Sequence, residues 1–247
     1  MRIYLLSLPF LLAKLLIKEQ LKEPVALLWI VISPVVTFYL ITYAKYSGEE
    51  RVRDYASATS WFYAFISSSV ALFGLAFYIV GRRESGFLRS FVYTKRTKIT
   101  FLAGQVLAYS FMSVIYCSVF YVLTRGYFGL MVLEEWLVIV GRFYMCFLLF
   151  STPSLLLTLV PIGFQNTNTL FSILSVSMLA LGIGSLSTSY SLFNVIDLFN
   201  PMGWANRLML VGVTGSAMLV ASILGMIIVT GWFVFRFLLI NPVWSRY

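Results

Sequence analysis

Apolar stretches of about 20 residues recur along this chain and are separated by short polar interruptions. Six such stretches run approximately over residues 25–44, 59–80, 100–123, 136–160, 168–187 and 212–240. About 20 residues of helix cross a hydrocarbon core of about 30 Å, and hydrocarbon offers no hydrogen-bond partner to an irregular backbone. The sequence therefore predicts an all-α integral membrane protein with six transmembrane helices, forming a single transmembrane domain over residues 1–247.

The balance of charged and apolar residues agrees with this class. Hydrophobic residues make up 60% of the chain and charged residues 11%, whereas an ordinary soluble domain has about 45–50% and 25%. Lys and Arg are concentrated in the segments that share a side of the membrane with the amino terminus, which predicts that both termini are cytoplasmic. The formal charge of +9 requires no nucleic-acid partner, because this orientation and the anionic lipid bilayer explain it.

An amphipathic helix is expected over residues 5–23, before the first span. Its leucines repeat at helical spacing, and Lys14 and Lys18 fall mainly on the other side. Such a helix lies along the inner surface of the membrane. Two interpretations stay open: the helix anchors the chain to lipid, or it contacts a cytosolic partner.

The segment between the second and third spans, residues 81–99, holds a third of the chain's eighteen Lys and Arg residues. Within it, Phe87, Leu88, Phe91 and Val92 recur at helical spacing, which a merely connecting loop does not need. We therefore expect a short amphipathic helix at the cytoplasmic face. The alternative is a cluster of positive charges whose long side chains reach the headgroups.

The segment over residues 188–211, between the fifth and sixth spans, is expected outside the membrane and is too apolar for a freely solvated loop. It carries Phe193, Phe199 and Trp204, and Asn200-Pro201 interrupts it. The pattern predicts two short re-entrant helices that dip into the outer interface. An ordinary belt of interfacial aromatic residues is the alternative.

Arg142 lies inside the fourth apolar stretch. A charge at the bilayer centre costs about 2.5–3.5 kcal/mol on insertion scales, so this side chain is expected to face protein or water, or to reach the headgroups. Glu135 precedes it by seven residues on roughly the same helical face. The two residues are candidates for an ion pair or for the lining of a translocation path.

The chemistry of common active sites is missing from the sequence. The chain has no histidine, and its two cysteines, Cys117 and Cys146, are not spaced as a metal or redox pair. It has no phosphate-binding loop of the Gly-x-x-x-x-Gly-Lys type and no Gly-x-Ser-x-Gly elbow. We therefore expect no catalytic residue, no metal and no cofactor in this chain, and any nucleotide-driven step would need another polypeptide.

The layout resembles that of the permease subunits of the ABC type-2 exporter family. An amphipathic helix precedes a first span with Trp29 and Ser33-Pro34, the stretch Arg82-Arg83-Glu84-Ser85-Gly86 ends the second span, and Asn200-Pro201 precedes a long last span. The resemblance implies a permease that forms half of an export path in a bacterial plasma (inner) membrane, beside a second identical or related permease. Family membership does not reveal the cargo, but aromatic spans with little charge inside suit an amphipathic cargo such as a peptide, a drug or a lipid-like molecule.

In that family the helix after the second span is a coupling helix that docks on a cytosolic ATPase, which binds ATP and magnesium. The resemblance places ATPase coupling on Arg82, Arg83, Glu84, Gly86 and Arg89, with Lys14 and Lys18 of the amino-terminal helix. It places an outer gate on Phe193, Phe199 and Trp204. The alternative function is a membrane protein that acts by binding, such as an immunity or assembly factor, with that outer segment as its contact surface.

Overall fold

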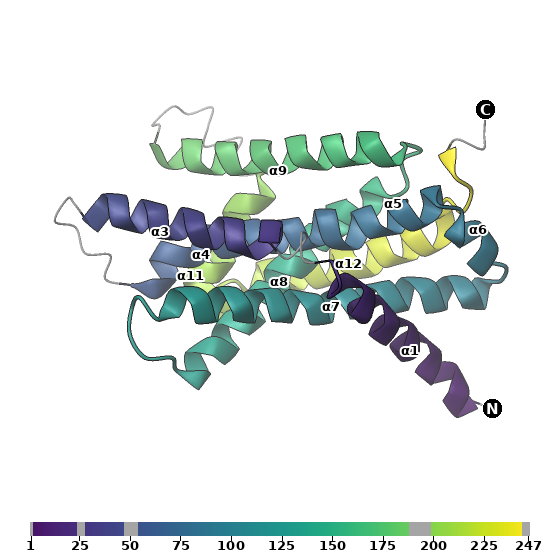
Figure 1. Cartoon of the computed structure of the whole chain (residues 1–247), viewed down its shortest axis with the longest axis horizontal. Helices are drawn as coiled ribbons and strands as arrows, with labels where there is room; N and C mark the ends of the chain where they lie inside the picture. The colour runs from purple at the N-terminus through teal and green to yellow at the C-terminus, as the bar shows by residue number, and fades with distance from the viewer. Residues whose placement is uncertain (1, 24–27, 47–53, 188–198, 244–247) are drawn as a thin grey trace.

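The computed structural model describes residues 2–23, 28–46, 54–187 and 199–243, and every regular element within them is a helix. Most helices run along the long axis of the molecule, whereas α1 (Arg2–Gln20) crosses the bundle obliquely (Figure 1). The all-α fold predicted from the sequence is confirmed for the described residues.

Four helices are long and apolar enough to cross a membrane. One is the continuous helix Tyr55–Glu84, built from α4 (Tyr55–Ser69), the π-helical segment η2 (Val70–Ala76) and α5 (Phe77–Glu84); the others are α7 (Lys95–Arg125), α8 (Leu133–Leu157) and α12 (Ala217–Phe237). Even the shortest, with 21 residues, is about 30 Å long. These helices correspond to four of the six predicted spans, so the chain is a membrane protein by helix length and composition.

The other two predicted spans are helical but are not among these four. Residues 25–44 contain the π-helical segment η1 (Leu28–Ile32) and α3 (Ser33–Tyr46), and residues 168–187 lie in α9 (Phe164–Ser187). The apolar stretch Leu28–Tyr43 is shorter than a full span. The six-span layout therefore stays a prediction.

The helix Tyr55–Glu84 forms the centre of the bundle. It packs against α7 and α8, and its α4 part also packs against α11 (Pro201–Gly215). Within its apolar window 72% of the residues are buried, against 17% in α12. The central helix is thus surrounded by protein, whereas α12 presents most of its apolar surface outward.

A group of buried hydroxyls joins two helices inside the bundle. The hydroxyl of Tyr55 lies 2.8 Å from that of Tyr63 and 2.9 Å from that of Thr124, which joins α4 to α7. The Tyr63 ring packs edge-on against Phe120, and both are fully buried. Because an unpaired hydroxyl is costly in an apolar interior, these contacts fix the register between the two helices.

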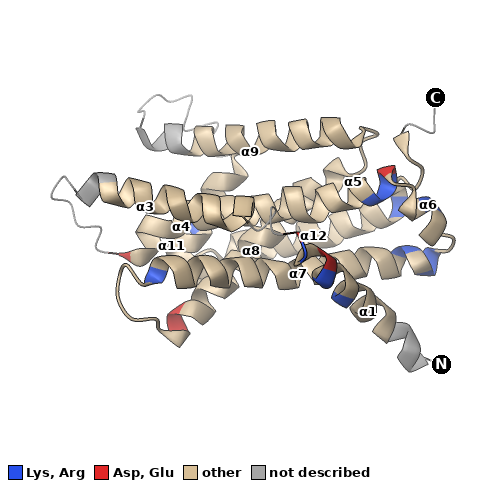
Figure 2. Cartoon of the chain, in the orientation of Figure 1, with Lys and Arg blue, Asp and Glu red and all other residues tan. Residues whose placement is uncertain are grey.

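Charged residues gather at the two ends of the bundle, and a further group lies on α1 (Figure 2). At one end, here called the basic end, Lys98 near the start of α7 lies 5.7 Å from the ring centre of Phe235 near the end of α12. At the opposite end, here called the far end, Arg125 and Glu135 form an ion pair of 2.6 Å between α7 and α8. If a membrane surrounds the apolar helices, the two charged ends lie in water on its opposite sides.

The amino-terminal helix differs in detail from the expected one. It ends at Gln20 rather than at residue 23, and it packs against α7 through Ala13 and Leu16. Leu11 and Leu15 are exposed on the same side as Lys14 and Lys18. The leucines are therefore divided between a face toward α7 and an outer face beside the lysines, where lipid can cover them.

Candidate functional site

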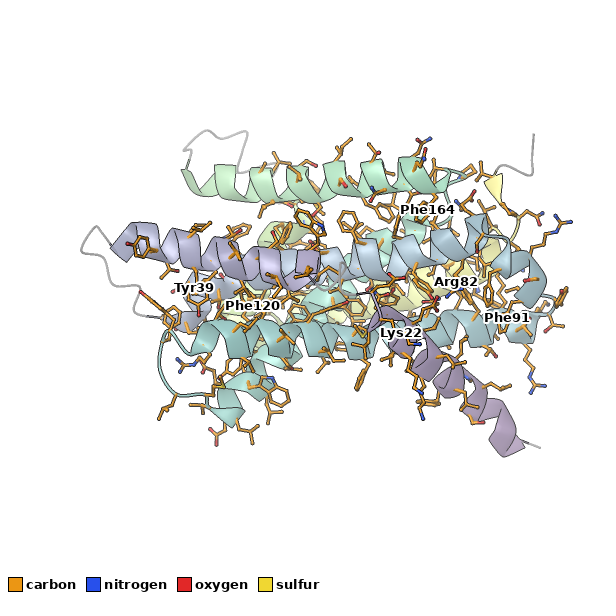
Figure 3. All side chains as sticks on the ribbon, viewed as in Figure 1. Lys22, Tyr39, Arg82, Phe91, Phe120 and Phe164 are labelled. Carbon is orange, nitrogen blue, oxygen red and sulfur yellow. The ribbon has the colours of Figure 1, made fainter. Side chains whose placement is uncertain are left out.

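Arg82 connects α5 to α1 at the basic end. Its guanidinium pairs with the Glu19 carboxylate and with the Tyr78 hydroxyl, which itself donates to Glu19 (Figure 3). The guanidinium also lies over the rings of Tyr78 and Phe87, 4.7 and 5.0 Å from their centres. Arg82 therefore fixes the carboxyl end of α1 against the central helix and α6 (Phe87–Phe91).

Arg83 is fully buried and satisfies the carbonyl oxygens that follow α8. Its Nη1 donates to Thr158 O at 3.0 Å and Val160 O at 3.2 Å, and its Nη2 donates to Ile162 O at 2.5 Å. The last carbonyls of a helix have no partner within it, so a buried helix end needs such donors. Arg83 thus acts inside the protein, between α5 and the turn that precedes α9.

Glu84 also faces inward. Its carboxylate accepts a 2.8 Å hydrogen bond from Arg83 Nε and lies 3.2 Å from the amide of Val243, and its side chain is 11% exposed. The pair Arg83–Glu84 therefore ties together α5, the end of α8 and the carboxyl-terminal segment. Neither side chain is offered to a partner at the surface in the way that the resemblance implies.

The surface at the tip of the basic end is formed by the turn after α5. Gly86 has φ 78°, a left-handed conformation that reverses the chain, and Leu88 of α6 is fully buried beneath it. The exposed side chains that follow, here called the α6 surface, are Arg89, Ser90, Tyr93, Lys95 and Arg96. Among the described residues the three cations of this surface have no carboxylate partner. Of the predicted coupling residues, Arg89 is thus exposed and forms no ion pair within the described part of the chain, as is also true of Lys14 and Lys18 in α1.

The α6 surface is held firmly from below. The rings of Phe87 and Phe91 stack at 5.3 Å between centres, and Val92 is buried. Thr94 caps α7 through a reciprocal pair of hydrogen bonds with Thr97. The predicted segment therefore contains a helix of 5 residues, α6, with Leu88 buried in the bundle. An amphipathic coupling helix at the cytoplasmic face stays a prediction.

The ion pair expected between Arg142 and Glu135 is not formed. Glu135 pairs with Arg125 instead and accepts a 3.1 Å hydrogen bond from the Tyr121 hydroxyl. Arg142 donates to the carbonyl oxygens of Met209 at 2.7 Å and Leu210 at 3.3 Å. The ion-pair alternative was wrong because the turn after α7 brings Arg125 to Glu135, and Arg142 instead binds carbonyl oxygens at the end of a broken helix. A place for Arg142 and Glu135 in a translocation path stays a prediction.

That break lies at Gly212, where α11 departs from helical geometry with φ 86° and ψ 178°. A Cβ atom at this position would lie 2.9 Å from Arg142 Nη2. The guanidinium therefore occupies the space that a side chain at residue 212 would need. Arg142 caps the carbonyls on the amino-terminal side of the break.

The outer segment is only partly described. Phe193 lies outside the described residues, Phe199 is exposed, and Trp204 is half-buried in α11. Asn200 caps the start of α11: its Oδ1 accepts from Met202 N at 3.1 Å, and its Nδ2 donates to Met178 O of α9 at 3.0 Å. α11 packs against α4 and α8, so this helix is part of the bundle.

No group of His, Cys, Asp and Glu side chains that could hold a metal occurs among the described residues. Cys117 and Cys146 are buried free thiols. Sequence analysis missed three contacts between distant residues: Glu19 binds Arg82, 63 positions away, Arg83 binds Ile162, 79 positions away, and Arg125 binds Glu135, 10 positions away. No pattern within one helix or turn indicates such contacts.

Over 195 aligned residues the chain is 30% identical to Protein McbE of Escherichia coli, and the alignment covers 77% of this chain and 79% of McbE. No model of a protein family matches the chain, and no solved structure matches it. The similarity extends over most of both chains, so it concerns the membrane bundle as a whole.

Proposed function

The chain belongs to the family of Protein McbE, and from that premise we propose that it is the permease subunit of an ATP-binding-cassette exporter. A separate cytosolic ATPase subunit would bind ATP and magnesium and drive transport. Two permeases, identical or related, would enclose the export path in a bacterial inner membrane, with both termini of this chain in the cytoplasm. The proposed cargo is amphipathic: a peptide, a drug or a lipid-like molecule.

The α6 surface is the observation that carries this proposal. Three cations and an exposed tyrosine project from a turn whose underside is buried. Charges without intramolecular partners favour association with a surface of opposite sign. A coupling helix needs this combination of an exposed polar face and a fixed base, because a loosely held helix would absorb the movement of the ATPase.

The buried pair Arg83–Glu84 supports a route for that movement. Arg83 is bonded to the carbonyls after α8, and Glu84 is bonded to the amide of Val243. Displacement of α6 would therefore pull on the end of α8 and on the carboxyl-terminal segment together. In this proposal Arg89, with Tyr93 and Arg96, contacts the ATPase, while Arg83 and Glu84 transmit the displacement.

Affinity purification tests the proposal. The tagged full chain is purified from native membranes in mild detergent, and co-purifying proteins are identified by mass spectrometry. We expect a P-loop ATPase with the wild-type chain and at least a tenfold loss of that ATPase with Arg89→Glu combined with Arg96→Glu, since like charges would face each other. Glu134→Lys, a charge reversal at the exposed far end, is the control and should leave the ATPase bound.

Two outcomes would overturn the proposal. One is transport of cargo by this chain reconstituted alone, without any ATPase. The other is full biological activity in cells that lack every co-purifying ATPase, which is expected for an immunity or assembly factor that acts by binding.

A further inference from the structure

A cavity of about 460 Å³ lies where α11 meets α12. It is lined by Trp204 and Arg207 of α11 and by Ser216, Ala217, Met218 and Leu219 at the start of α12. Because α12 ends beside Lys98 at the basic end, this cavity faces toward the far end. It shares no residue with the α6 surface, so a role for it is independent of the proposed coupling to an ATPase.

Two sets of backbone groups here lie at helix ends. The carbonyl oxygens of Met209 and Leu210, before the break at Gly212, are satisfied by Arg142. The amides of the first turn of α12, which begins at Ala217, have no acceptor within the helix and carry a partial positive charge. Ala217, Met218 and Leu219 of this turn line the cavity, so the positive end of α12 lies at the cavity.

Ser216 adds an unused polar group. It precedes α12 in the position where serine normally accepts a hydrogen bond from the helix, yet its side chain makes no such bond. The residue is 8% exposed, and its buried Oγ has no hydrogen-bond partner among the residues that the structure describes. A buried hydroxyl without a partner costs free energy, so a ligand that accepts from it would be stabilised.

Arg207 supplies a full charge at the same cavity. Its side chain is exposed, it forms no ion pair with any described carboxylate, and the described residues that line the cavity include no acidic residue. Arginine binds phosphate and carboxylate groups through paired N–H donors. Helix amides, a free hydroxyl and a guanidinium are the donors that an oxyanion requires.

The remaining wall is apolar. Trp204 is half-buried, and Met218 is 92% exposed, so the cavity opens beside hydrophobic surface on a helix that faces outward. We propose that this cavity binds the phosphate group of an anionic amphiphile at the membrane interface, with the phosphate at Arg207, Ser216 and the first turn of α12. The apolar part of the ligand lies along Trp204 and Met218.

Native mass spectrometry of the full chain in neutral detergent tests this inference. Phosphatidylglycerol is titrated against phosphatidylcholine, and the bound lipid is counted per chain. We expect one phosphatidylglycerol to bind saturably and in preference to phosphatidylcholine. Arg207→Gln should weaken this binding about tenfold or more, Ser216→Ala several-fold, and Arg207→Lys less than Arg207→Gln.

Arg89→Gln at the basic end is the matched control and should leave phosphatidylglycerol binding unchanged.

Inorganic phosphate, added as a competitor, shows whether the bound phosphate group comes from a lipid or from the free ion. Displacement of the lipid at millimolar phosphate indicates an anion site that also takes the free ion, whereas lipid binding that resists phosphate indicates a lipid site. Either result supports the inference when Arg207→Gln weakens the lipid binding as predicted. Equal binding of both lipids, or equal effects of Arg207→Gln and Arg89→Gln, would overturn it. Each variant should elute from a size-exclusion column at the wild-type volume, which verifies that it is folded. If Arg207→Gln fails to fold, the lipid binding of Ser216→Ala tests the inference instead.

Discussion

Arg83 and Arg142 each donate to backbone carbonyls at the end of a helix. Arg83 serves the end of α8, and Arg142 serves the part of α11 before Gly212. In a membrane protein the carbonyls of a broken helix cannot be left to water, so protein donors must satisfy them. The two arginines thus make helix breaks possible within the bundle, which is a structural role and requires no substrate.

Replacement of Arg83 by glutamine should strongly destabilise the protein. It would leave three carbonyl oxygens short of a donor and would remove the guanidinium that lies 2.8 Å from the Glu84 carboxylate at a nearly buried site. Breaking a buried pair from one side costs about 3–5 kcal/mol. Arg82→Gln, the same change one residue earlier at a more exposed side chain, should cost clearly less. Thermal unfolding of both variants in detergent measures this difference, and equal melting temperatures would contradict it.

Gly212→Ala should also destabilise the protein, by about 1–3 kcal/mol. The new Cβ would meet the Arg142 guanidinium at 2.9 Å, and alanine would be forced into a left-handed backbone conformation. Gly231→Ala in α12 is the control, because no atom lies within 4 Å of its Cβ position. That substitution should be neutral or slightly stabilising. A shift of the same sign and size in both variants would count against the assigned role of Gly212.

The sequence indicated that Arg142 is an unusual residue, but it did not indicate which atoms Arg142 binds. Arg142 was singled out because a charge in an apolar stretch is costly. Its acceptors belong to residues 67 and 68 positions away, and they are backbone atoms that any residue type carries. No spacing rule within one helix can therefore reveal them.

Among the described helices, α1 crosses the bundle obliquely and packs extensively against α7, whereas α6 is a short helix at the basic end. Arg82 joins both through Glu19 and Phe87. The hydrophobic spacing in residues 81–99 was sufficient to predict α6, because its repeat is local. The contact of α1 with α7 was not predictable, since it depends on Gly104 and Leu12 meeting across two helices.

Gly104→Val should displace α1 from α7. A Cβ atom at Gly104 would lie 2.9 Å from Leu12 Cδ2 and 3.2 Å from Leu12 Cβ, so rotation of one side chain cannot relieve the overlap. Trypsin should then cleave after Lys14 and Lys18 several-fold faster than in the wild type, because a released helix opens locally. Gly141→Val in α8, where the Cβ position is open, is the control. An unchanged cleavage pattern for Gly104→Val would show that α1 does not depend on this close approach.

The molecule as a whole has an apolar body between two charged ends. Length and hydropathy were sufficient to predict helical spans, because spanning a hydrocarbon core imposes both. Composition alone could not separate protein-facing from outward-facing helices, and the central helix and α12 differ greatly in burial although both are strongly apolar. Which helix lies at the centre depends on packing between distant segments.

Orientation across the membrane is testable with single cysteines. Ser90→Cys in the α6 surface and Glu134→Cys at the start of α8 lie at opposite ends and are both exposed. In intact cells a membrane-impermeant maleimide should label Glu134→Cys and leave Ser90→Cys unlabelled until the membrane is opened. Cys117 and Cys146 are buried and should give little background. Labelling of both sites in intact cells is incompatible with the proposed topology.

The most direct test of the account is photo-crosslinking from Tyr93, which is 78% exposed in the α6 surface. A photoreactive phenylalanine analogue at Tyr93 is compared with the same analogue at Leu130, which is 89% exposed in the turn between α7 and α8. Adducts formed in living cells are identified by mass spectrometry. The account predicts a P-loop ATPase in the Tyr93 adduct and none in the Leu130 adduct. The absence of an ATPase from the Tyr93 adduct, or its presence in the Leu130 adduct alone, would contradict the assignment of the α6 surface as the coupling site.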